Sequence, residues 1–143
     1  MSRAASPRDL QRLVDAAIAV RAKAYAPYSG YAVGAAILTR SGGLHAGCNV
    51  ENATYGATSC AERSAIAAMV AAGDRDPIAC AVVTAGPDPG APCGICRQVL
   101  AEFARDMKLV LVAHARGKVT KKKTERLAKL LPRAFRLRPL PSA

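Results

Sequence analysis

Hydrophobic residues recur every three or four positions near the start of the chain, which is the spacing of one helix face. The stretch covers residues 6–26, and it opens with Ser6 as a candidate N-cap and Pro7 in the first turn. Polar and charged residues occupy the positions between the hydrophobic ones, so the pattern predicts an amphipathic first helix. The hydrophobic positions are Leu10, Leu13, Val14, Ala17 and Ile18.

Three later stretches also have helical character. Residues 60–73 are rich in alanine and end in a glycine, and residues 93–104 follow a proline that suits the start of a helix. Residues 124–131 predict a short last helix, with Thr124 as its cap and Pro132 as its stop. The chain therefore has four predicted helices.

Strand patterns lie between these helices. Residues 77–85 and 108–115 are continuous apolar runs, as expected for strands buried on both faces. Residues 33–40 and 44–52 flank a Ser-Gly-Gly turn and predict a hairpin, and residues 117–123 predict a lysine-rich edge strand. Helices that alternate with buried strands predict the α/β class, here a three-layer α/β/α sandwich with a mixed sheet of about five strands.

Length and composition agree with a single globular domain over residues 1–143. Hydrophobic residues make up 51% of the chain and charged residues 22%, and no apolar run approaches the roughly 20 residues of a membrane span. The first residues contain no apolar signal core, and five cysteines are an odd number. These features predict a cytoplasmic protein without a membrane partner, in which cysteines serve metal binding or catalysis rather than disulfides.

The net charge of +11 is unevenly distributed. Residues 1–115 contain 11 basic and nine acidic residues, a net of +2, whereas residues 116–143 contain 10 basic residues and one acidic residue, a net of +9. The main body is thus nearly neutral, and the C-terminal segment 116–143 is strongly basic. High overall charge alone therefore does not indicate a nucleic-acid-binding protein.

Three cysteines fall at the starts of two predicted helices. Cys60 begins one helix, and Cys93 and Cys96 begin another. A helix N-terminus favours the thiolate form, and three thiolates with an open fourth position are typical of catalytic zinc. A redox pair or a disulfide is the alternative for Cys93 and Cys96, but it leaves Cys60 and its neighbour Glu62 unexplained. We interpret the three cysteines as ligands of one Zn²⁺ per chain.

These motifs resemble those of the cytidine deaminases of the small homotetrameric type that act on free nucleosides. The resemblance rests on Cys-Ala-Glu at residues 60–62 and Pro-Cys-Gly-Ile-Cys-Arg-Gln at residues 92–98, with supporting matches at residues 24–37 and 47–56. It spans residues 20–135. It implies hydrolytic deamination of cytidine and 2′-deoxycytidine in pyrimidine salvage, a nucleoside substrate and a homotetramer.

The resemblance also implies roles for individual residues. Glu62 is the expected catalytic acid–base group, which moves a proton from water to the cytosine ring. Three thiolates overcompensate the charge of Zn²⁺, and either Arg63 or Arg97 can donate to a thiolate sulfur and restore the acidity of the metal. Surface salt bridges are the alternative role for both arginines, and this alternative has more weight for Arg63 than for Arg97.

The expected substrate contacts lie in three further motifs. Asn49 and Glu51 are expected to bind the ribose hydroxyls, Tyr31 to pack on the base, and Ala61 to contact the substrate. Tyr55 and Phe135 align with aromatic positions that approach a neighbouring subunit's site in the family, with core packing as the alternative. The chain departs from the family pattern in its basic C-terminal segment, which puts the placement of Phe135 in question.

Rival functions remain open at this point. They are deamination of a cytosine-containing antibiotic, editing of cytosine in nucleic acid, and a non-catalytic zinc-stabilised interaction module. Asn49 and Glu51 favour a nucleoside over the first two, and Glu62 beside an open metal position opposes the third. We expect nucleic acid to bind weakly at most, through the basic segment. Cys48 and Cys80 are expected to be small hydrophobic residues.

Overall fold

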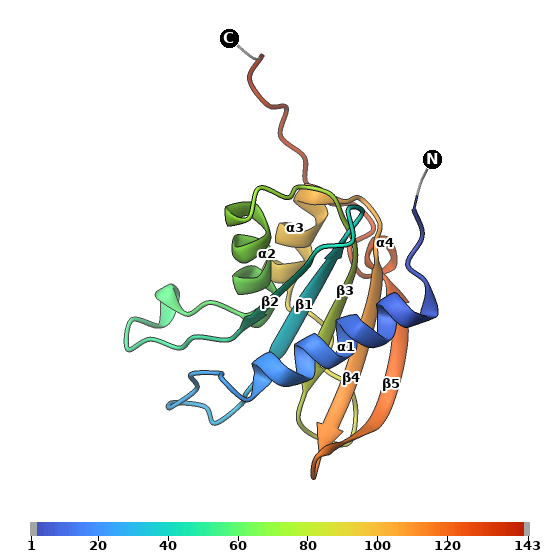
Figure 1. The fold of residues 1–143 in the computed structure, drawn as a ribbon. Coiled ribbons are helices and arrows are strands. Elements are labelled where there is room, and N and C mark those ends of the chain that lie inside the picture. The colour runs from blue at the N-terminus through green and yellow to red at the C-terminus, as the bar shows by residue number, and fades with distance from the viewer. Residues whose placement is uncertain (1–2, 142–143) are drawn as a thin grey trace.

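A five-stranded sheet with helices on both faces forms the framework of the molecule (Figure 1). The structure is a computed structural model, and it describes residues 3–141. The strand order is β2-β1-β3-β4-β5; β3 and β4 are parallel, and the other neighbouring pairs are antiparallel. The strands are β1 (Gly34–Thr39), β2 (Leu44–Cys48), β3 (Pro77–Thr84), β4 (Lys108–Ala115) and β5 (Lys118–Arg126).

The helices divide between the two faces of this mixed sheet. Helix α1 crosses one face, while α2 and α3 cover the other (Figure 1). This arrangement confirms the predicted α/β architecture and its mixed sheet. None of the helices in residues 3–141 has the length and apolar character needed to cross a membrane. The helices are α1 (Pro7–Arg21), the 3-10 turn η1 (Tyr55–Ala57), α2 (Ala61–Ala71), α3 (Gly94–Phe103) and α4 (Leu127–Leu130).

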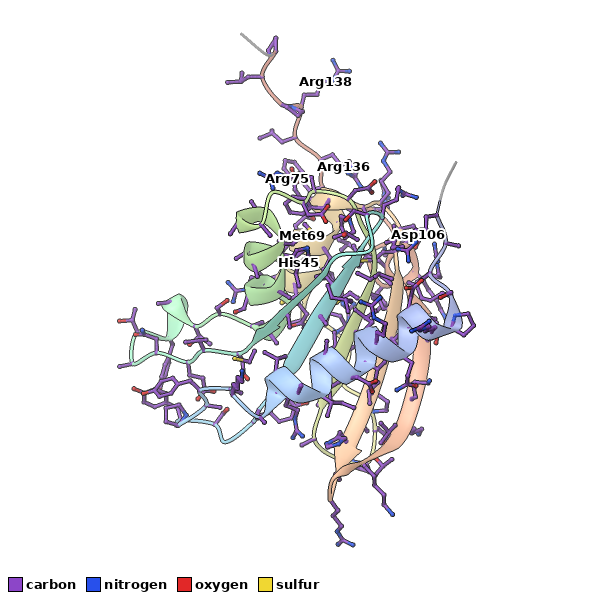
Figure 2. All side chains as sticks on the ribbon, in the orientation of Figure 1. His45, Met69, Arg75, Asp106, Arg136 and Arg138 are labelled. Atoms are coloured by element: carbon purple, nitrogen blue, oxygen red, sulfur yellow. The ribbon has the colours of Figure 1, made fainter. Side chains whose placement is uncertain are left out.

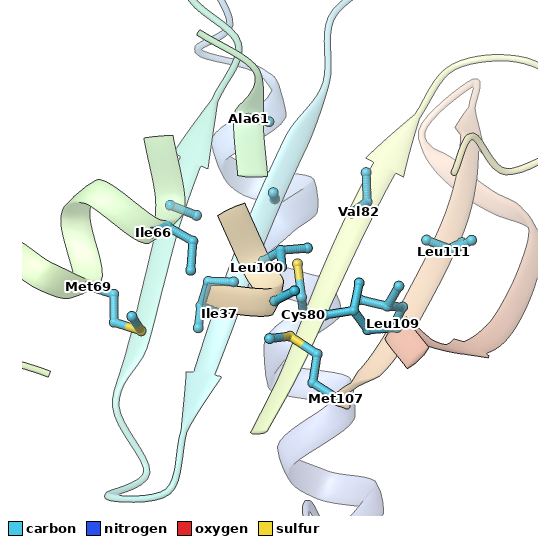
Figure 3. Packing of buried hydrophobic residues seen from close by; sticks show 14 residues of the cluster. Ile37, Ala61, Ile66, Met69, Cys80, Val82, Leu100, Met107, Leu109 and Leu111 are labelled. Atoms are coloured by element: carbon cyan, nitrogen blue, oxygen red, sulfur yellow. The ribbon is translucent and has the colours of Figure 1, made fainter. Parts of the chain in front are cut away.

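Alternation along the strands separates two hydrophobic layers. In β1, Ala36 and Leu38 pack with α1, whereas Ala35 and Ile37 pack with α2 and α3. Figure 3 shows the second layer, with Ile37 of the sheet facing Leu100 of α3. Since the central strands are covered on both faces, nearly all their residues are buried, as the continuous apolar runs predicted.

The start of α1 follows the sequence prediction and adds an unpredicted acid. Ser6 is the N-cap, and its Oγ accepts a hydrogen bond from the Asp9 backbone N–H at 3.1 Å. The Asp9 carboxylate accepts from the Ser6 N–H at 3.1 Å, which completes a capping box, and it pairs with Arg3 at 3.0 Å. The bonds from Ser6, and then the Arg3 charge, lower the pKa of Asp9.

Two glycines allow helices to lie directly on the sheet backbone. A Cβ added to Gly34 would meet the Ala17 carbonyl oxygen of α1 at 2.1 Å. A Cβ added to Gly47 of β2 would meet the Ala65 backbone nitrogen of α2 at 2.3 Å. Side chains cannot be tolerated at such distances, so both glycines fix how closely the helices approach the strands.

The end of the chain corrects one boundary. The helix predicted from Thr124 begins instead at Leu127, because β5 continues to Arg126 and pairs with β4 over its whole length. Thr124 therefore lies in the strand and caps nothing. The fully buried Leu127 sets the turn into α4, and its N–H donates to the Met107 carbonyl at 3.0 Å.

Candidate active site

Two helix starts bring three cysteine sulfurs together. Cys60 is the N-cap of α2, Cys93 is the N-cap of α3, and Cys96 lies in the first turn of α3. The sulfurs of Cys60 and Cys93 are 4.0 Å apart, and all three sulfurs lie within 4.8 Å of one another. Cysteines 33 positions apart in the sequence are thus adjacent because α2 and α3 pack side by side.

The three sulfurs fit a zinc ion. Sulfurs held at about 2.3 Å around a tetrahedral ion lie about 3.8 Å apart, close to the spacing found here. Burial, followed by the nearby charges of Glu62 and Cys60, raises the pKa of the Cys96 thiol far above its usual range. Without a cation, this proximity therefore disfavours the ionised form of the three thiols. A bound metal ion between the sulfurs would compensate the repulsion and allow all three to be thiolates.

Glu62 lies beside this cluster at the base of α2. Its carboxylate Oε2 is 3.6 Å from the Cys96 sulfur, and the residue is 5% exposed. Burial raises the pKa of Glu62, which the Arg63 charge opposes only weakly. A carboxyl group whose pKa is raised in this way binds a proton more readily than an exposed one, which suits a general acid–base group.

Arg63 contacts the cluster as predicted. Its Nη2 donates to the Cys60 sulfur at 3.8 Å and to the Thr58 carbonyl oxygen at 2.8 Å. The bond to Cys60 is the main cause that raises the pKa of Arg63. Because Arg63 follows Cys60 by three positions, one turn of helix places its guanidinium beside the thiolate.

Arg97 contacts different groups. Its Nε donates to the Pro92 carbonyl at 2.7 Å, and its Nη1 donates to the Leu130 carbonyl at 3.0 Å. The guanidinium therefore braces the loop before α3 and the end of α4. Neither of these bonds goes to a sulfur, so of the two arginines it is Arg63 that donates to a thiolate in the described part of the chain.

A cavity of about 310 Å³ opens over the cysteines and Glu62. This volume is at the lower end of the range for small-molecule sites. Four of the predicted substrate residues line it, namely Tyr31, Asn49, Glu51 and Ala61. The cavity, the carboxyl group and two of the sulfur ligands thus form one site.

Asn49 and Glu51 are held in place by the loop that walls the cavity. The Asn49 side chain donates to the Tyr31 carbonyl at 2.8 Å and accepts from the Val33 N–H at 2.9 Å. The Glu51 carboxylate accepts from the Ser29 hydroxyl at 2.5 Å and from the N–H groups of Tyr28 and Ser29. The Ser29 hydroxyl is the first cause that lowers the pKa of Glu51.

Tyr31 faces a glycine across the cavity wall. A Cβ added to Gly90 would lie 3.2 Å from the Tyr31 hydroxyl and 3.1 Å from a methyl carbon of Thr84. The Gly90 N–H donates to the Thr84 hydroxyl at 2.9 Å. Gly90 therefore leaves room for the tyrosine hydroxyl at the edge of the cavity.

The two remaining aromatic candidates lie outside this cavity. Tyr55 is 80% exposed and packs edge-on against Tyr28, with ring centroids 6.3 Å apart. Phe135 is 69% exposed, and its carbonyl accepts from the Gln98 side chain. These exposures exclude core packing for both rings.

Seven lining residues were not among the predicted site residues, and three of these are Ser29, Thr84 and Gly90. Thr84 is the last residue of a buried strand that leads toward the cysteines of α3, and this position could have suggested it. Gly90 lies in a loop rich in proline and glycine. A single sequence does not distinguish a glycine that leaves room for a neighbouring side chain from one that only forms a turn. The loop that contains Ser29 was expected over the site from the resemblance, and the structure adds the bond from Ser29 to Glu51.

Comparison with known proteins agrees with this geometry. The model of the family described as "Cytidine and deoxycytidylate deaminase zinc-binding region" matches residues 7–113. The chain belongs to this deaminase family. The match, together with the cluster of Cys60, Cys93 and Cys96, supports one zinc ion per chain, as predicted.

Relatives in this deaminase family are similar over most of the chain. A cytidine deaminase of Sporosarcina psychrophila is 42% identical over 127 residues, which cover 89% of this chain and 91% of that protein. A crystal structure of cytidine deaminase from Burkholderia pseudomallei has a TM-score of 0.80 and 44% identity, and covers 87% of this chain and 98% of that one. The structure from Mycobacterium tuberculosis has a TM-score of 0.74 and 40% identity, covering 90% and 98%. The predictions of fold and family are confirmed.

Proposed function

We propose that this protein is a zinc-dependent hydrolase that deaminates cytidine and 2′-deoxycytidine to uridine and 2′-deoxyuridine, with release of ammonia. The observation that carries the proposal is that three features meet at one place. They are three sulfurs within 4.8 Å of one another, a buried carboxyl 3.6 Å from one of them, and a cavity of about 310 Å³. Each feature alone occurs in proteins of many functions, but hydrolytic deamination requires all three.

The chemistry requires a nucleophilic water and a group that moves protons. When bound, zinc supplies Lewis acidity that makes water a nucleophile near neutral pH. Glu62 takes a proton from that water and delivers it to ring atom N3. A bond forms between the water oxygen and C4. Glu62 then takes the remaining proton of that oxygen and gives it to the C4 amino group, so that the bond from C4 to the amino nitrogen breaks, ammonia leaves and a C4 carbonyl remains.

The cavity wall binds and orients the nucleoside. The amide of Asn49 keeps one N–H and one acceptor lone pair beyond its two loop bonds, and the Glu51 carboxylate keeps unused lone pairs. We propose that Asn49 donates to or accepts from a ribose hydroxyl, and that the Glu51 carboxylate accepts from one. The Tyr31 ring packs on the base, and the buried backbone at Ala61 closes the base end of the cavity.

Steady-state deamination of a panel of cytosine compounds tests this assignment. The panel contains cytidine, 2′-deoxycytidine and a cytosine-containing antibiotic, and loss of cytosine absorbance measures the rate. We expect turnover of both nucleosides and a much lower kcat/KM for the antibiotic, since Asn49 and Glu51 serve a ribose. A preference for the antibiotic would reject the nucleoside assignment while leaving the deaminase chemistry intact.

The assembly and setting of the enzyme are part of the same proposal. We infer a homotetramer in which Tyr55 and Phe135 approach a neighbouring subunit's site, a single deaminase domain, and a cytoplasmic role in pyrimidine salvage. The exposure of Tyr55 and Phe135 supports the contact in trans. Light scattering checks the assembly, and a fully active monomer would release both aromatic residues from that role.

Nucleic acid is a weak partner at most in this proposal. A 3′-phosphate in place of the ribose 3′-hydroxyl would meet the Glu51 carboxylate and forfeit a donor, and each defect costs on the order of 1 kcal/mol or more. Incubation with single-stranded DNA and RNA at physiological salt, followed by sequencing, is the check. Conversion of cytosine to uracil at a rate comparable with free cytidine would contradict it.

A further inference from the structure

A second cavity, rich in arginine, lies at the other end of the sheet. It has a volume of about 360 Å³ and is lined by Arg105, Arg133 and Arg136 together with apolar residues such as Leu131 and Pro132. Figure 2 shows Arg136 at the end of the molecule from which the C-terminal segment leaves. No carboxylate lines this cavity within residues 3–141.

Hydrogen bonds fix the segment that carries two of these arginines. Arg97 of α3 donates to the Leu130 carbonyl at 3.0 Å, and Gln98 donates to the Phe135 carbonyl at 3.0 Å. The backbone of residues 131–136 is therefore tied to α3 at both of its ends. As a result, Arg133 and Arg136 are presented from an anchored segment rather than from a free tail.

The acid that follows Arg105 in the sequence is already paired with other groups. Asp106 accepts two bonds from Arg126, at 2.6 and 3.0 Å, and one from the Ala128 N–H at 3.2 Å. The ion pairs formed within residues 3–141 include none with Arg105, Arg133 or Arg136. The cavity thus has a charge of +3 with no counter-charge from the described part of the chain.

Most lysines of the C-terminal segment lie in β5, although Arg126 ends that strand and Lys129 lies in α4. The lysines of β5 protect an open edge, and several pair with acids: Lys121 with Asp88, and Lys123 with Glu125. The cavity contains arginine only. A guanidinium presents a planar fork of donors that matches two phosphate oxygens, whereas a lysine ammonium is a point charge.

We propose that this arginine cavity binds the di- or triphosphate group of a small anion such as a free nucleotide. Three guanidinium forks match an anion that carries several charges on adjacent phosphates, and the volume is within the range of small-ligand sites. The apolar wall at Leu131 and Pro132 suits the uncharged part of such a ligand. The net +9 of residues 116–143 raises the local concentration of anions around it.

The site is separate from the cysteine cluster. Arg105 precedes β4 and α4 follows β5, so both lie at the end of the sheet opposite the helix starts that carry Cys60 and Cys93. Arg133 and Arg136 also lie beyond residues 7–113, the region that the family model matches. The cavity is therefore distinct from the cysteine cluster of the same chain.

Calorimetric titration of the zinc-loaded full chain with inorganic pyrophosphate at 0.15 M salt tests the proposal. We expect one site per chain in the wild type. The double variant R105Q/R133Q should bind about tenfold more weakly or worse, because it loses two charge-assisted contacts. The matched control K118Q/K122Q removes two exposed charges from β5 and should change the Kd by less than about threefold.

Two further titrations distinguish binding at the arginine cavity from nonspecific attraction to the basic segment. A purine nucleoside triphosphate should bind with the same sensitivity to R105Q/R133Q, and R136Q alone should weaken it as well. A single-stranded oligonucleotide without a terminal phosphate should bind more weakly than the triphosphate. The proposal fails if pyrophosphate does not bind the wild type, if both double variants weaken it equally, or if the oligonucleotide binds more tightly.

Discussion

At the end of the sheet where α2 and α3 begin, three sulfurs and a carboxyl group lie within a few ångströms of one another, and Cys96 and Glu62 are buried there. At the opposite end, three arginines lie at the surface around an open cavity. Closely packed negative charges that are partly buried are stable only when a metal ion compensates them. Positive charges at the surface are instead screened by water and salt. Substitutions at the first end should therefore have far larger effects than those at the second.

The largest effect is expected from the metal ligands. Cys93→Ala should reduce zinc content from about one per chain to near zero and abolish deamination. It should also cost several kcal/mol of folding stability, since binding energy at such a site is also folding energy. Elemental analysis and thermal unfolding measure both. Cys48→Ala, which alters a half-buried cysteine outside the cluster, should keep its zinc. Full zinc occupancy in Cys93→Ala would reject the ligand assignment.

Glu62→Gln should separate chemistry from structure. The amide keeps the shape of the side chain but cannot move a proton, so kcat should fall by about 10²–10⁴ or more. Zinc content and the melting temperature should stay near those of the wild type. Glu102→Gln, at an exposed acid of α3, is the matched control and should retain activity. Near-normal turnover by metal-replete Glu62→Gln would assign the proton transfer to another group.

The two arginines near the cysteines should give opposite signatures. Arg63→Gln removes a donor to the Cys60 sulfur and should lower kcat/KM or zinc affinity by about 10–100-fold. Arg97→Gln removes two bonds to carbonyl oxygens and should lower the free energy of unfolding by about 1–3 kcal/mol, with a smaller effect on kcat/KM. Urea unfolding and steady-state kinetics on both variants measure the contrast. The reverse pattern would restore the role that the sequence suggested for Arg97.

The smallest effect concerns an acid at the arginine end. Hydrogen bonds, first from Thr39 and then from Ser41, lower the pKa of Asp74 from 3.8 to about 2. A depressed pKa means that the ionised form stabilises the folded state at pH above about 4, and that this contribution is lost as the pH falls toward 2. Asp74→Asn should therefore reduce stability at neutral pH and flatten its decline between pH 4 and 2. Parallel acid-unfolding curves would exclude Asp74 as a source of that decline.

The sequence alone was sufficient for the cysteine end because its signals are local. Cys60 and Glu62 are two positions apart, Cys93 and Cys96 are three apart, and both pairs begin predicted helices. Periodicity also predicted the sheet, since continuous apolar runs indicate strands buried on both faces. The boundary at Thr124 was wrong because pairing with β4, a long-range interaction, extended β5 past a plausible local cap.

Long-range contacts also account for what the sequence could not show. That Arg97 reaches the Leu130 carbonyl, 33 positions away, depends on how α4 docks against α3. The bonds that hold Glu51 to Ser29 depend on how a loop folds over the cavity. The arginine cavity combines residues from two distant segments, and the basic run indicated its charge but not its shape.

The bare contact between Gly47 of β2 and the Ala65 backbone of α2 has a consequence for how the enzyme can vary. That contact sets the distance between the sheet and the helix that carries Cys60 and Glu62. A methyl group at position 47 would force α2 outward by several tenths of an ångström or more. Because α3 carries the other two cysteines on its own support, the shift would appear directly as a mismatch between the two halves of the zinc site. We expect Gly47→Ala to damage metal binding from a position that touches no ligand, so catalytic precision here depends on the absence of a side chain.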